Sequence, residues 1–359
     1  MTGSERRFTL VLGGGGMKGL AHAGALQALE ERDFLPADLV GSSIGALMGA
    51  AWCAGISAEE LTALALEVRQ RDLFQVAHRD MALKRMRSPA LYRKEPLEHV
   101  VRGLLGDVTF QELERPLFVN TVDVNTGTQV LWGAPGLNDV PVADAVLASC
   151  ALPGYLPPHE INGRHFMDGA AVSNLPVGVA AARGHDLVMA VDVGASGVLK
   201  ADMHLAGFAA VFARAIEIAI ENRRTGVLRA WEWPPLLLVQ PRVEQYGMFS
   251  FGHNRELVEE GYRATKELLS DPTTIPGPNA SGVYPRQHYH VRVDREHCIG
   301  CGHCLVNAPW GLFRLDDEGR AVVTDREQVW SPVEAEIVRQ CPTYAIAVHP
   351  ANHPPREED

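Results

Sequence analysis

Short apolar runs and longer amphipathic stretches alternate along the chain from Phe8 to Ser270. The short runs are rich in β-branched and aliphatic residues, as strands are, and the longer stretches repeat apolar residues at helical spacing. They predict strands at Phe8–Leu12, Leu39–Gly41, Leu117–Val124, Gln129–Trp132, Leu187–Val193 and Leu236–Val239. They predict helices at Lys18–Arg32, Ile44–Ala54, Ala58–Val68, Val142–Cys150, Val177–Arg183, Ala206–Ala230 and Arg255–Leu269. Because strands that alternate with helices form a parallel sheet covered by helices, we expect an α/β fold.

The alternation stops at Asp271. Residues 271–287 contain four prolines and two glycines and show no periodicity, which is typical of a linker. We therefore expect a large domain over residues 1–270, a linker over 271–287, a small domain over 288–349 and a tail over 350–359. The length agrees, because single hydrophobic cores rarely grow beyond about 250 to 300 residues.

The composition is that of an ordinary globular protein, with 46% hydrophobic and 21% charged residues. A net charge of −11 argues against nucleic-acid binding, since a polyanion would be repelled. The N-terminus has only a five-residue apolar run, too short for the core of a signal peptide. Six cysteines in so long a chain do not make a disulfide scaffold, so we expect a cytoplasmic protein.

Two segments bear on membrane contact. Leu39 to Ala58 is a run of 20 uncharged residues, long enough for a membrane span, but glycines and serines interrupt it. A buried strand, turn and helix fits that run better. The basic stretch from Arg69 to Lys94 is open to two interpretations. It is either a solvated helix and loop, or a surface for anionic lipid headgroups that would bring the protein to a membrane peripherally.

A glycine-rich loop, Gly13 to Gly19, follows the first predicted strand and precedes a helix. Backbone amides in such a loop can converge on an anion. A P-loop is excluded, because Gly19 stands where the Ser or Thr after Lys18 is required. The loop does contain the dinucleotide pattern GxGxxG, but the acidic residue that should come after the second strand is missing.

The second predicted strand leads instead into Gly41-Ser42-Ser43-Ile44-Gly45, a GxSxG pattern between a strand and a helix. This is the context of a nucleophile elbow, in which a tight turn with small neighbours lifts a serine hydroxyl above the sheet. Ser43 is therefore a candidate nucleophile. Such a serine needs a base to accept its proton.

The base is the harder residue to choose. Three late histidines, His204, His253 and His288, have no recognisable motif around them. A carboxylate can do the same task if it contacts the serine directly, and Asp168 in Asp-Gly-Ala offers one in a turn. Two further carboxylates near strand ends, at Asp123 and Asp192, are rivals for the role.

These pieces resemble a known family. The order GGGxKG, GxSxG and DGA is similar to that of the patatin-like phospholipases, as are Ser149–Pro153 and Asn174–Pro176. The resemblance implies a patatin-like parallel-sheet sandwich and a catalytic dyad with no histidine. It makes Ser43 the nucleophile and Asp168 the base, and the substrate a lipid acyl ester such as a phospholipid, lysophospholipid or acylglycerol. It assigns the oxyanion hole to the loop amides at Gly14, Gly15 and Gly16.

A second constellation lies near the C-terminus. Cys298, Cys301 and Cys304 form a CxxCxxC pattern, and Cys341 follows at a distance with a proline behind it. A zinc site usually pairs two CxxC hooks, whereas three close cysteines with one remote Cys-Pro fit an iron–sulfur cubane. Ala308 stands where a ligand of a second cluster would be, so we expect one [4Fe-4S] cluster held by these four cysteines.

The small domain resembles single-cluster bacterial ferredoxins over nearly its whole length, including the ending Cys-Pro-Thr-Tyr-Ala-Ile. The resemblance implies a ferredoxin-like α+β fold and a redox partner protein. It does not say whether the cluster transfers electrons, regulates the large domain or serves docking.

Three functions therefore compete. The leading one is a lipid acyl hydrolase with an appended iron–sulfur domain. The alternative from another class is an iron–sulfur electron carrier or redox sensor whose large domain only binds. A dinucleotide-linked oxidoreductase, which would pair the glycine loop with the cluster, is the third.

Overall fold

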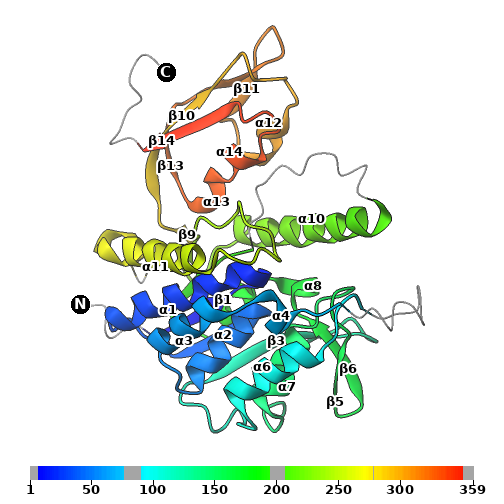
Figure 1. Ribbon diagram of the computed structural model, residues 1–359. Helices are drawn as coiled ribbons and strands as arrows, with labels where there is room; N and C mark the ends of the chain where they lie inside the picture. Colours follow the sequence, from blue (N-terminus) through cyan, green and yellow to red (C-terminus); the bar gives the residue numbers. More distant parts are fainter. Residues whose placement is uncertain (1–6, 77–89, 195–206, 278, 351–359) are drawn as a thin grey trace.

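The computed structural model describes residues 7–76, 90–194, 207–277 and 279–350. A large domain carries a nine-stranded sheet between layers of helices, and a small domain with a three-stranded antiparallel sheet follows it (Figure 1). The fold is the expected α/β class with a small α+β domain.

The large sheet has the order β5-β6-β3-β2-β1-β7-β8-β9, with β4 paired to β3. The strands β1, β2, β3, β7, β8 and β9 run parallel, and β4, β5 and β6 run antiparallel to their neighbours. Their bounds are β1 Phe8–Leu12, β2 Asp38–Ser42, β3 Leu117–Asp123, β4 Gln129–Trp132, β5 His159–Ile161, β6 Arg164–Asp168, β7 Leu187–Val191, β8 Leu236–Val239 and β9 Val283–Tyr284. The central strands β1, β2, β3 and β7 are buried throughout, as parallel strands covered on both faces must be.

Helices cover both faces of this sheet. The larger apolar core lies against the face covered by α1, α2, α3, α6, α7 and α11, and a smaller one lies against the face covered by α9 and α10. The bounds in the large domain are the 3₁₀ turn η2 Gly16–Leu20, α1 Ala21–Glu31, α2 Ile44–Cys53, α3 Ala58–Glu67, α4 Gln70–Leu73, α6 Glu95–Leu105, α7 Val142–Ser149, α8 Ala170–Ser173, α9 Val177–Ala181, α10 Gly207–Arg229, α11 Asn254–Ser270 and the 3₁₀ turn η5 Pro272–Thr274.

In the small domain β10 lies between β13 and β14, and β11 and β12 form a separate hairpin. The bounds are β10 Gln287–Val293, α12 His303–Asn307, β11 Phe313–Leu315, β12 Ala321–Val323, β13 Glu327–Trp330, α13 Pro332–Ala335, α14 Ile337–Gln340 and β14 Ile346–Pro350. Its own apolar core includes Val291, Trp330 and Ile337, together with Cys304 and Cys341.

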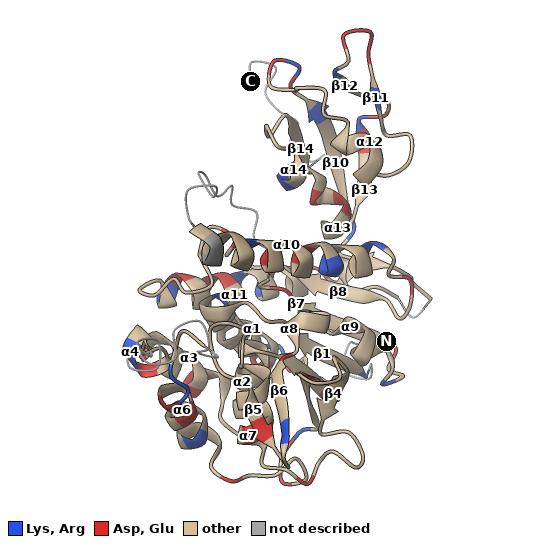
Figure 2. Cartoon of the chain, turned by 90° about the vertical axis from the view of Figure 1, so that its right-hand side faces the viewer, with Lys and Arg blue, Asp and Glu red and all other residues tan. Residues whose placement is uncertain are grey.

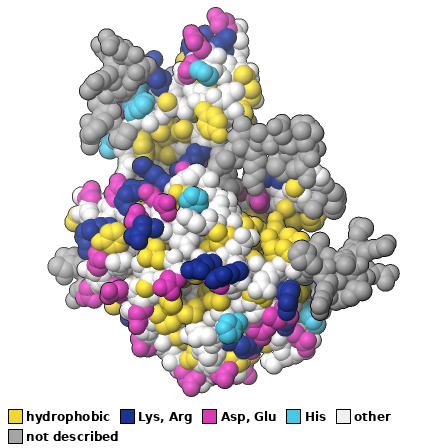
Figure 3. Space-filling view, viewed as in Figure 1, with side chains coloured by type: hydrophobic (Ala, Val, Ile, Leu, Met, Phe, Trp, Pro, Cys, Tyr) yellow, Lys and Arg dark blue, Asp and Glu magenta, His cyan; other side chains and the backbone are white. Residues whose placement is uncertain are grey.

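The two domains pack against each other. The small domain stands over α10, with α13 on the side that faces the large domain (Figure 2). Val333 of α13 is buried in the same cluster as Leu236 and Val283 of the large domain. On the face seen in Figure 3, acidic and basic side chains are interspersed.

Some elements differ from the expectation. The helix α6 is not among the predicted helices, although Leu97, Val101 and Leu105 form a buried stripe on it at four-residue spacing. The antiparallel pair β5 and β6 is also absent from the predicted strands. The segment 271–287, predicted as a linker, holds η5 and the strand β9, which pairs with β8 at the edge of the large sheet. Part of the linker is thus built into the large domain.

The two segments that bear on membranes have different outcomes. Residues 39 to 58 form β2, the turn after it and α2, as expected. Across the described ranges, no helix has the length and apolar character needed to span a bilayer. Much of the basic stretch, residues 77–89, lies outside the described residues. The proposed lipid-headgroup surface there remains a prediction.

Candidate active site

Ser43 lies in a sharp turn between β2 and α2. Its backbone has φ 54° and ψ −129°, a conformation that non-glycine residues rarely adopt. The flanking glycines allow the turn: a Cβ on Gly41 would lie 2.5 Å from the Cα of Ala46, and one on Gly45 would lie 2.2 Å from the carbonyl oxygen of Leu12. The strained turn at the N-terminus of α2 is the geometry expected of a nucleophile elbow.

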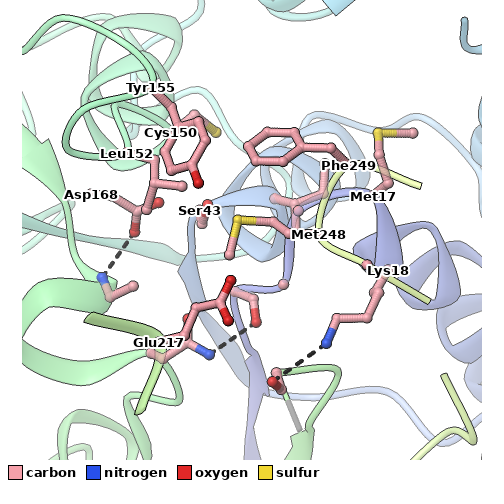
Figure 4. Close-up of a pocket in the computed structure, with 18 of the residues that line it drawn as sticks. Met17, Lys18, Ser43, Cys150, Leu152, Tyr155, Asp168, Glu217, Met248 and Phe249 are labelled. Carbon is pink, nitrogen blue, oxygen red and sulfur yellow. Dashed lines mark hydrogen bonds between the residues drawn. The ribbon is translucent and has the colours of Figure 1, made fainter. Parts of the chain in front are cut away.

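The strand β3 brings Asp168 to this serine. Ser42 pairs with Asn120 of β3, and Asp168 pairs with the next residue, Thr121. Since β4 pairs with both of these β3 residues on the other side, β2 and β6 follow one another along the same side of β3. The end of β2, which leads into Ser43, therefore meets the end of β6 at Asp168. Figure 4 shows the two side chains close together.

The Asp168 carboxylate is buried, with 1% of the residue exposed. Its Oδ1 accepts a 2.8 Å hydrogen bond from the N–H of Ala170. Burial raises the pKa of Asp168 to about 6, although the Ala170 N–H and the Ser43 hydroxyl both lower it. A carboxylate with this pKa is ionised at neutral pH and is still basic enough to accept a proton, as a general base requires.

The glycine loop lies beside Ser43 but its three amides are not equivalent. The N–H of Gly14 donates to the carbonyl of Asn174 at 3.0 Å, so Gly14 does not fit the oxyanion-hole role predicted for it. Among the described residues, the N–H groups of Gly15 and Gly16 have no hydrogen-bond partner. Gly16 needs to be glycine because its φ is 59° and a Cβ would lie 2.4 Å from Met248. The candidate donors are therefore Gly15 and Gly16.

Lys18 and His22 hold the loop from behind. Lys18 is buried and its Nζ donates to the carbonyl of Gly194 at 3.4 Å. Burial lowers the pKa of Lys18, although nearby carboxylates raise it in part. The fully buried His22 contacts the carbonyl of Gly13 through Nε2 at 2.8 Å. Burial lowers the pKa of His22 to about 4, so the ring is neutral at pH 7. Both side chains therefore support the loop.

The two rival carboxylates are already bound elsewhere. Asp123 accepts from the backbone of its own turn and from Arg164 at 2.9 Å. Asp192 forms a buried ion pair with Arg224 at 2.6 Å. No histidine is among the described residues that line the cavity around Ser43.

That cavity has a volume of about 230 Å³, is partly open to solvent and is lined mainly by apolar side chains. Ser43, Asp168 and the glycine loop lie in its wall together with Tyr155, Met248 and Phe249 (Figure 4). Buried leucines from four segments form part of the wall: Leu47, Leu73, Leu97 and Leu156. Cys150 is partly buried and also lines the cavity. Such a cavity suits a flexible apolar chain with a reacting group near Ser43.

The four cysteines of the small domain line a second, much smaller cavity of about 20 Å³. Cys298 and Cys301 come from the loop that leads into α12, Cys304 lies at the start of α12, and Cys341 directly follows α14. Cys304 and Cys341 are buried and Cys301 is exposed. In the described ranges no three His, Cys, Asp or Glu side chains converge as they would on a single metal ion.

The surroundings of two of these sulfurs, those of Cys298 and Cys341, suit thiolates that bind a cluster. The N–H of Ala321 donates to Sγ of Cys298 at 3.4 Å, and the N–H of Ala345 donates to Sγ of Cys341 at 3.3 Å. Burial alone would raise the pKa of Cys341, but backbone N–H groups of Thr343, Ala345 and Ile346 outweigh it and lower the pKa. Hydrogen bonds of this kind stabilise cluster thiolates and tune their redox potential. The residues therefore fit an iron–sulfur cluster.

Comparison with protein families gives two matches. Residues 10–181 match the patatin-like phospholipase family, and residues 291–348 match the 4Fe-4S single cluster domain family. The first span contains Ser43 and Asp168, and the second contains all four cysteines.

Curated relatives match half of this chain or more. An uncharacterized NTE family protein of Mycobacterium tuberculosis is 33% identical over 193 residues, which is 54% of this chain and 51% of that protein. The neuropathy target esterase sws of Drosophila melanogaster is 34% identical over 52% of this chain and 13% of its own length. Lysophospholipase NTE1 of Candida glabrata is 29% identical over 78% of this chain and 17% of its own length. The chain thus spans about half the length of the mycobacterial relative and far less of the other two.

Solved structures give weaker likenesses. VipD from Legionella pneumophila matches with 14% identity and a TM-score of 0.41, covering 74% of this chain and 67% of VipD. ExoU in the ExoU–SpcU complex of Pseudomonas aeruginosa matches with 19% identity and a TM-score of 0.40, covering 74% of this chain and 51% of that chain. The two family matches identify this chain as a patatin-like phospholipase domain joined to a 4Fe-4S single cluster domain.

Proposed function

We propose that the protein is a serine acyl hydrolase that cleaves lipid acyl esters with a Ser43–Asp168 dyad. The observation that carries the proposal is the strained Ser43 elbow beside a buried carboxylate whose pKa is about 6, in the wall of an apolar cavity. The names of two relatives, a lysophospholipase and a neuropathy target esterase, support ester hydrolysis.

In the first half of the reaction, Ser43 Oγ attacks the acyl carbonyl carbon and its proton passes to the Asp168 carboxylate. The carbonyl oxygen becomes an oxyanion, which accepts hydrogen bonds from the N–H groups of Gly15 and Gly16. Because the loop already fixes these donors, they stabilise the oxyanion without reorganisation. The bond to the alcohol oxygen then breaks, and Asp168 returns the proton to the departing alcohol.

In the second half, water attacks the acyl group on Ser43. Asp168 takes a proton from that water and passes it to Ser43 Oγ as the ester bond breaks, which releases the fatty acid and restores the site. No third residue is needed, because the two strands that pair with β3 hold the serine and the carboxylate together.

The substrate we propose is an ester with a long apolar acyl chain. The buried leucines and the aromatic side chains of Phe74, Tyr155 and Phe249 form a wall for such a chain. The rings of Phe74 and Phe249 pack edge to face, with their centroids 5.2 Å apart. Burying each methylene of the chain contributes about 0.8 kcal/mol, so the cavity favours long chains.

We also propose that Cys298, Cys301, Cys304 and Cys341 hold one [4Fe-4S] cluster. The cluster would supply one-electron chemistry. The chain's own part is to present four thiolates, two of them buried, and to donate backbone N–H groups to the sulfurs of Cys298 and Cys341.

The test of the hydrolase is the hydrolysis of p-nitrophenyl esters of increasing chain length by anaerobically purified protein. We expect Ser43→Ala to abolish hydrolysis and Asp168→Asn to lower kcat by about 10³-fold or more. Asp123→Asn is the matched control. Asp123, at the end of β3, is a buried carboxylate like Asp168, but it bonds to its own turn and to Arg164.

The control should keep the wild-type kcat. Equal rates in wild type and Ser43→Ala would refute the proposal and favour the electron-carrier alternative. A loss in Asp123→Asn as large as in Asp168→Asn would refute the choice of base.

A further inference from the structure

A buried cluster of charges joins the two domains behind the glycine loop. Arg224 of α10 donates to Asp192 at 2.6 Å and to Glu336 of the small domain at 2.8 Å. The side chains of Arg224 and Asp192 are each 1% exposed and that of Glu336 is 7% exposed. Glu221, on the preceding turn of α10, also accepts from Arg224. Burial opposes the charge of Arg224, but the three carboxylates outweigh it and raise its pKa.

One end of this cluster supports the candidate oxyanion hole. Asp192 Oδ1 accepts from the N–H of Gly194 at 3.1 Å, and Gly194 accepts from Lys18 in the glycine loop. The intervening Val193 underlies Gly15, where an added Cβ would lie 2.8 Å from its side chain. The segment 192–194 is therefore the support on which Gly15 rests, and Arg224 fixes that segment through Asp192.

The other end lies in the small domain. Glu336 is the residue before α14, and Cys341 is the residue after it. The N–H of Cys341 donates to the carbonyl of Ile337, the first residue of that one-turn helix. Glu336 also accepts from Thr225 at 3.3 Å and from Gln240 at 3.4 Å, both in the large domain.

We infer that Arg224 is a positioning residue for hydrolysis and that Glu336 makes the small domain part of the hydrolase site. The Asp192–Arg224–Glu336 triad holds the segment 192–194 under Gly15, and so holds the oxyanion-hole amides at the distance that the oxyanion needs. The inference rests on the proposed Ser43–Asp168 hydrolase.

Two physical reasons support this inference: a buried charge cluster does not tolerate the loss of one member, and an oxyanion hole does not tolerate displacement of its donors. Buried charges are stable only while each is paired, so the loss of Glu336 makes Arg224 and Asp192 rearrange. Displacement of a positioned group by about 1 Å can lower a rate by about 10²-fold. The change should appear in kcat, because the oxyanion exists only in the transition state and the intermediate.

The experiment compares full-length, cluster-loaded wild type with Glu336→Ala, Glu336→Gln and Arg229→Ala. Arg229 is the matched control: it also lies on α10 and contacts the small domain, at Asn307 and Gln340, but it does not touch Asp192. Two quantities are measured at equal cluster absorbance. One is kcat and KM on a short p-nitrophenyl ester. The other is amide hydrogen exchange in the peptide that contains Gly14 and Met17, whose N–H groups are bonded to Asn174 and Met248.

We expect Glu336→Ala to lower kcat by about 10- to 100-fold with little change in KM, and to speed exchange in the glycine-loop peptide. Glu336→Gln, which keeps the shape and one hydrogen-bonding oxygen, should fall between Glu336→Ala and wild type, and Arg229→Ala should match wild type. If Glu336→Ala and Glu336→Gln leave both kcat and exchange unchanged, or if Arg229→Ala causes the same losses, the inference is wrong. Failure of the hydrolase itself would look different, since wild type would then show no Ser43-dependent hydrolysis at all.

Discussion

The N–H of Ser43 donates a 2.8 Å hydrogen bond to the hydroxyl of Ser149. That hydroxyl donates in turn to the carbonyl of Asn120 at 2.7 Å, and Ser149 is fully buried. The candidate nucleophile is therefore tied to β3, the strand whose next residue, Thr121, pairs with Asp168. One strand thus sets the position of both members of the proposed dyad.

Replacing Ser149 with alanine should separate the serine from this strand. The variant leaves the Ser43 N–H without its partner, which costs about 1 to 3 kcal/mol of folding free energy, and we expect kcat to fall by about tenfold or more. Ser57→Ala is the control. It removes the N-cap of α3 and costs about 1 kcal/mol, but it should leave kcat unchanged. The measurements are urea unfolding and steady-state hydrolysis, and a Ser149→Ala enzyme with wild-type kcat would contradict this role.

The elbow glycines should not accept a side chain. Gly45→Ala places a Cβ 2.2 Å from the Leu12 carbonyl, so we expect a loss of about 1 to 3 kcal/mol and of most activity. Gly103→Ala is the opposite case. Gly103 lies inside α6 with nothing within 4 Å of an added Cβ, so the change should stabilise the protein by about 0.5 to 1 kcal/mol. Thermal unfolding of the two variants tests the pair, and a stable, active Gly45→Ala enzyme would count against the elbow.

Asp168 should make stability depend on pH. Its pKa in the folded protein, about 6, is above the ordinary 3.8, so the folded state binds more protons between these values and stability falls as pH rises through them. At pH 8 the ionised carboxylate costs about 3 kcal/mol, since one pKa unit corresponds to about 1.4 kcal/mol. Asp168→Asn should therefore be more stable than wild type at pH 8, and this gain should vanish below pH 4. Urea unfolding across pH checks it; a gain that is independent of pH would contradict the assignment.

The same pKa predicts the pH dependence of catalysis. A base must be ionised to accept the Ser43 proton, so kcat/KM should rise with pH and reach half its maximum near pH 6. A rate that is flat between pH 5 and 8 would exclude Asp168 as the base.

The cavity predicts a dependence on acyl length. Leu97 of α6 is buried in the cavity wall, and a larger side chain there takes up space that a long acyl chain would use. We expect Leu97→Trp to lower kcat/KM for dodecanoyl esters by about tenfold or more while hydrolysis of acetyl esters continues. Equal effects on both esters would show that this wall does not hold the chain.

Much of the fold could be predicted because it is encoded in local patterns. The parallel strands, the elbow at Ser43 and the CxxCxxC pattern at Cys298, Cys301 and Cys304 each depend on residues close together in sequence, and the Cys-Pro pair marks Cys341. The pair β5 and β6 has no such signal, since its short strands are neither apolar nor alternating enough to stand out. Helix α6 does have one, in the spacing of Leu97, Val101 and Leu105, but the basic residues that precede it obscure the pattern.

The parts of the site that could not be predicted depend on long-range contacts. The N–H of Gly14 donates to the carbonyl of Asn174, 160 positions away, and no motif around Gly14 reveals this contact. The pairing of Arg224 with both Asp192 and Glu336 is invisible for the same reason. The sequence makes Asp192 a rival for the role of base because it stands near a strand end. The ion pair with Arg224 shows that its carboxylate has a structural partner instead.

The central claim is that Ser43 is a nucleophile activated by Asp168. The most direct measurement is mass spectrometry of the protein after reaction with a fluorophosphonate, with the labelling rate compared between wild type and Asp168→Asn. The account predicts one phosphonyl adduct on the peptide that contains Ser43, formed at least about 10²-fold more slowly in Asp168→Asn. An adduct on another residue, or equal labelling rates in the two proteins, would contradict it.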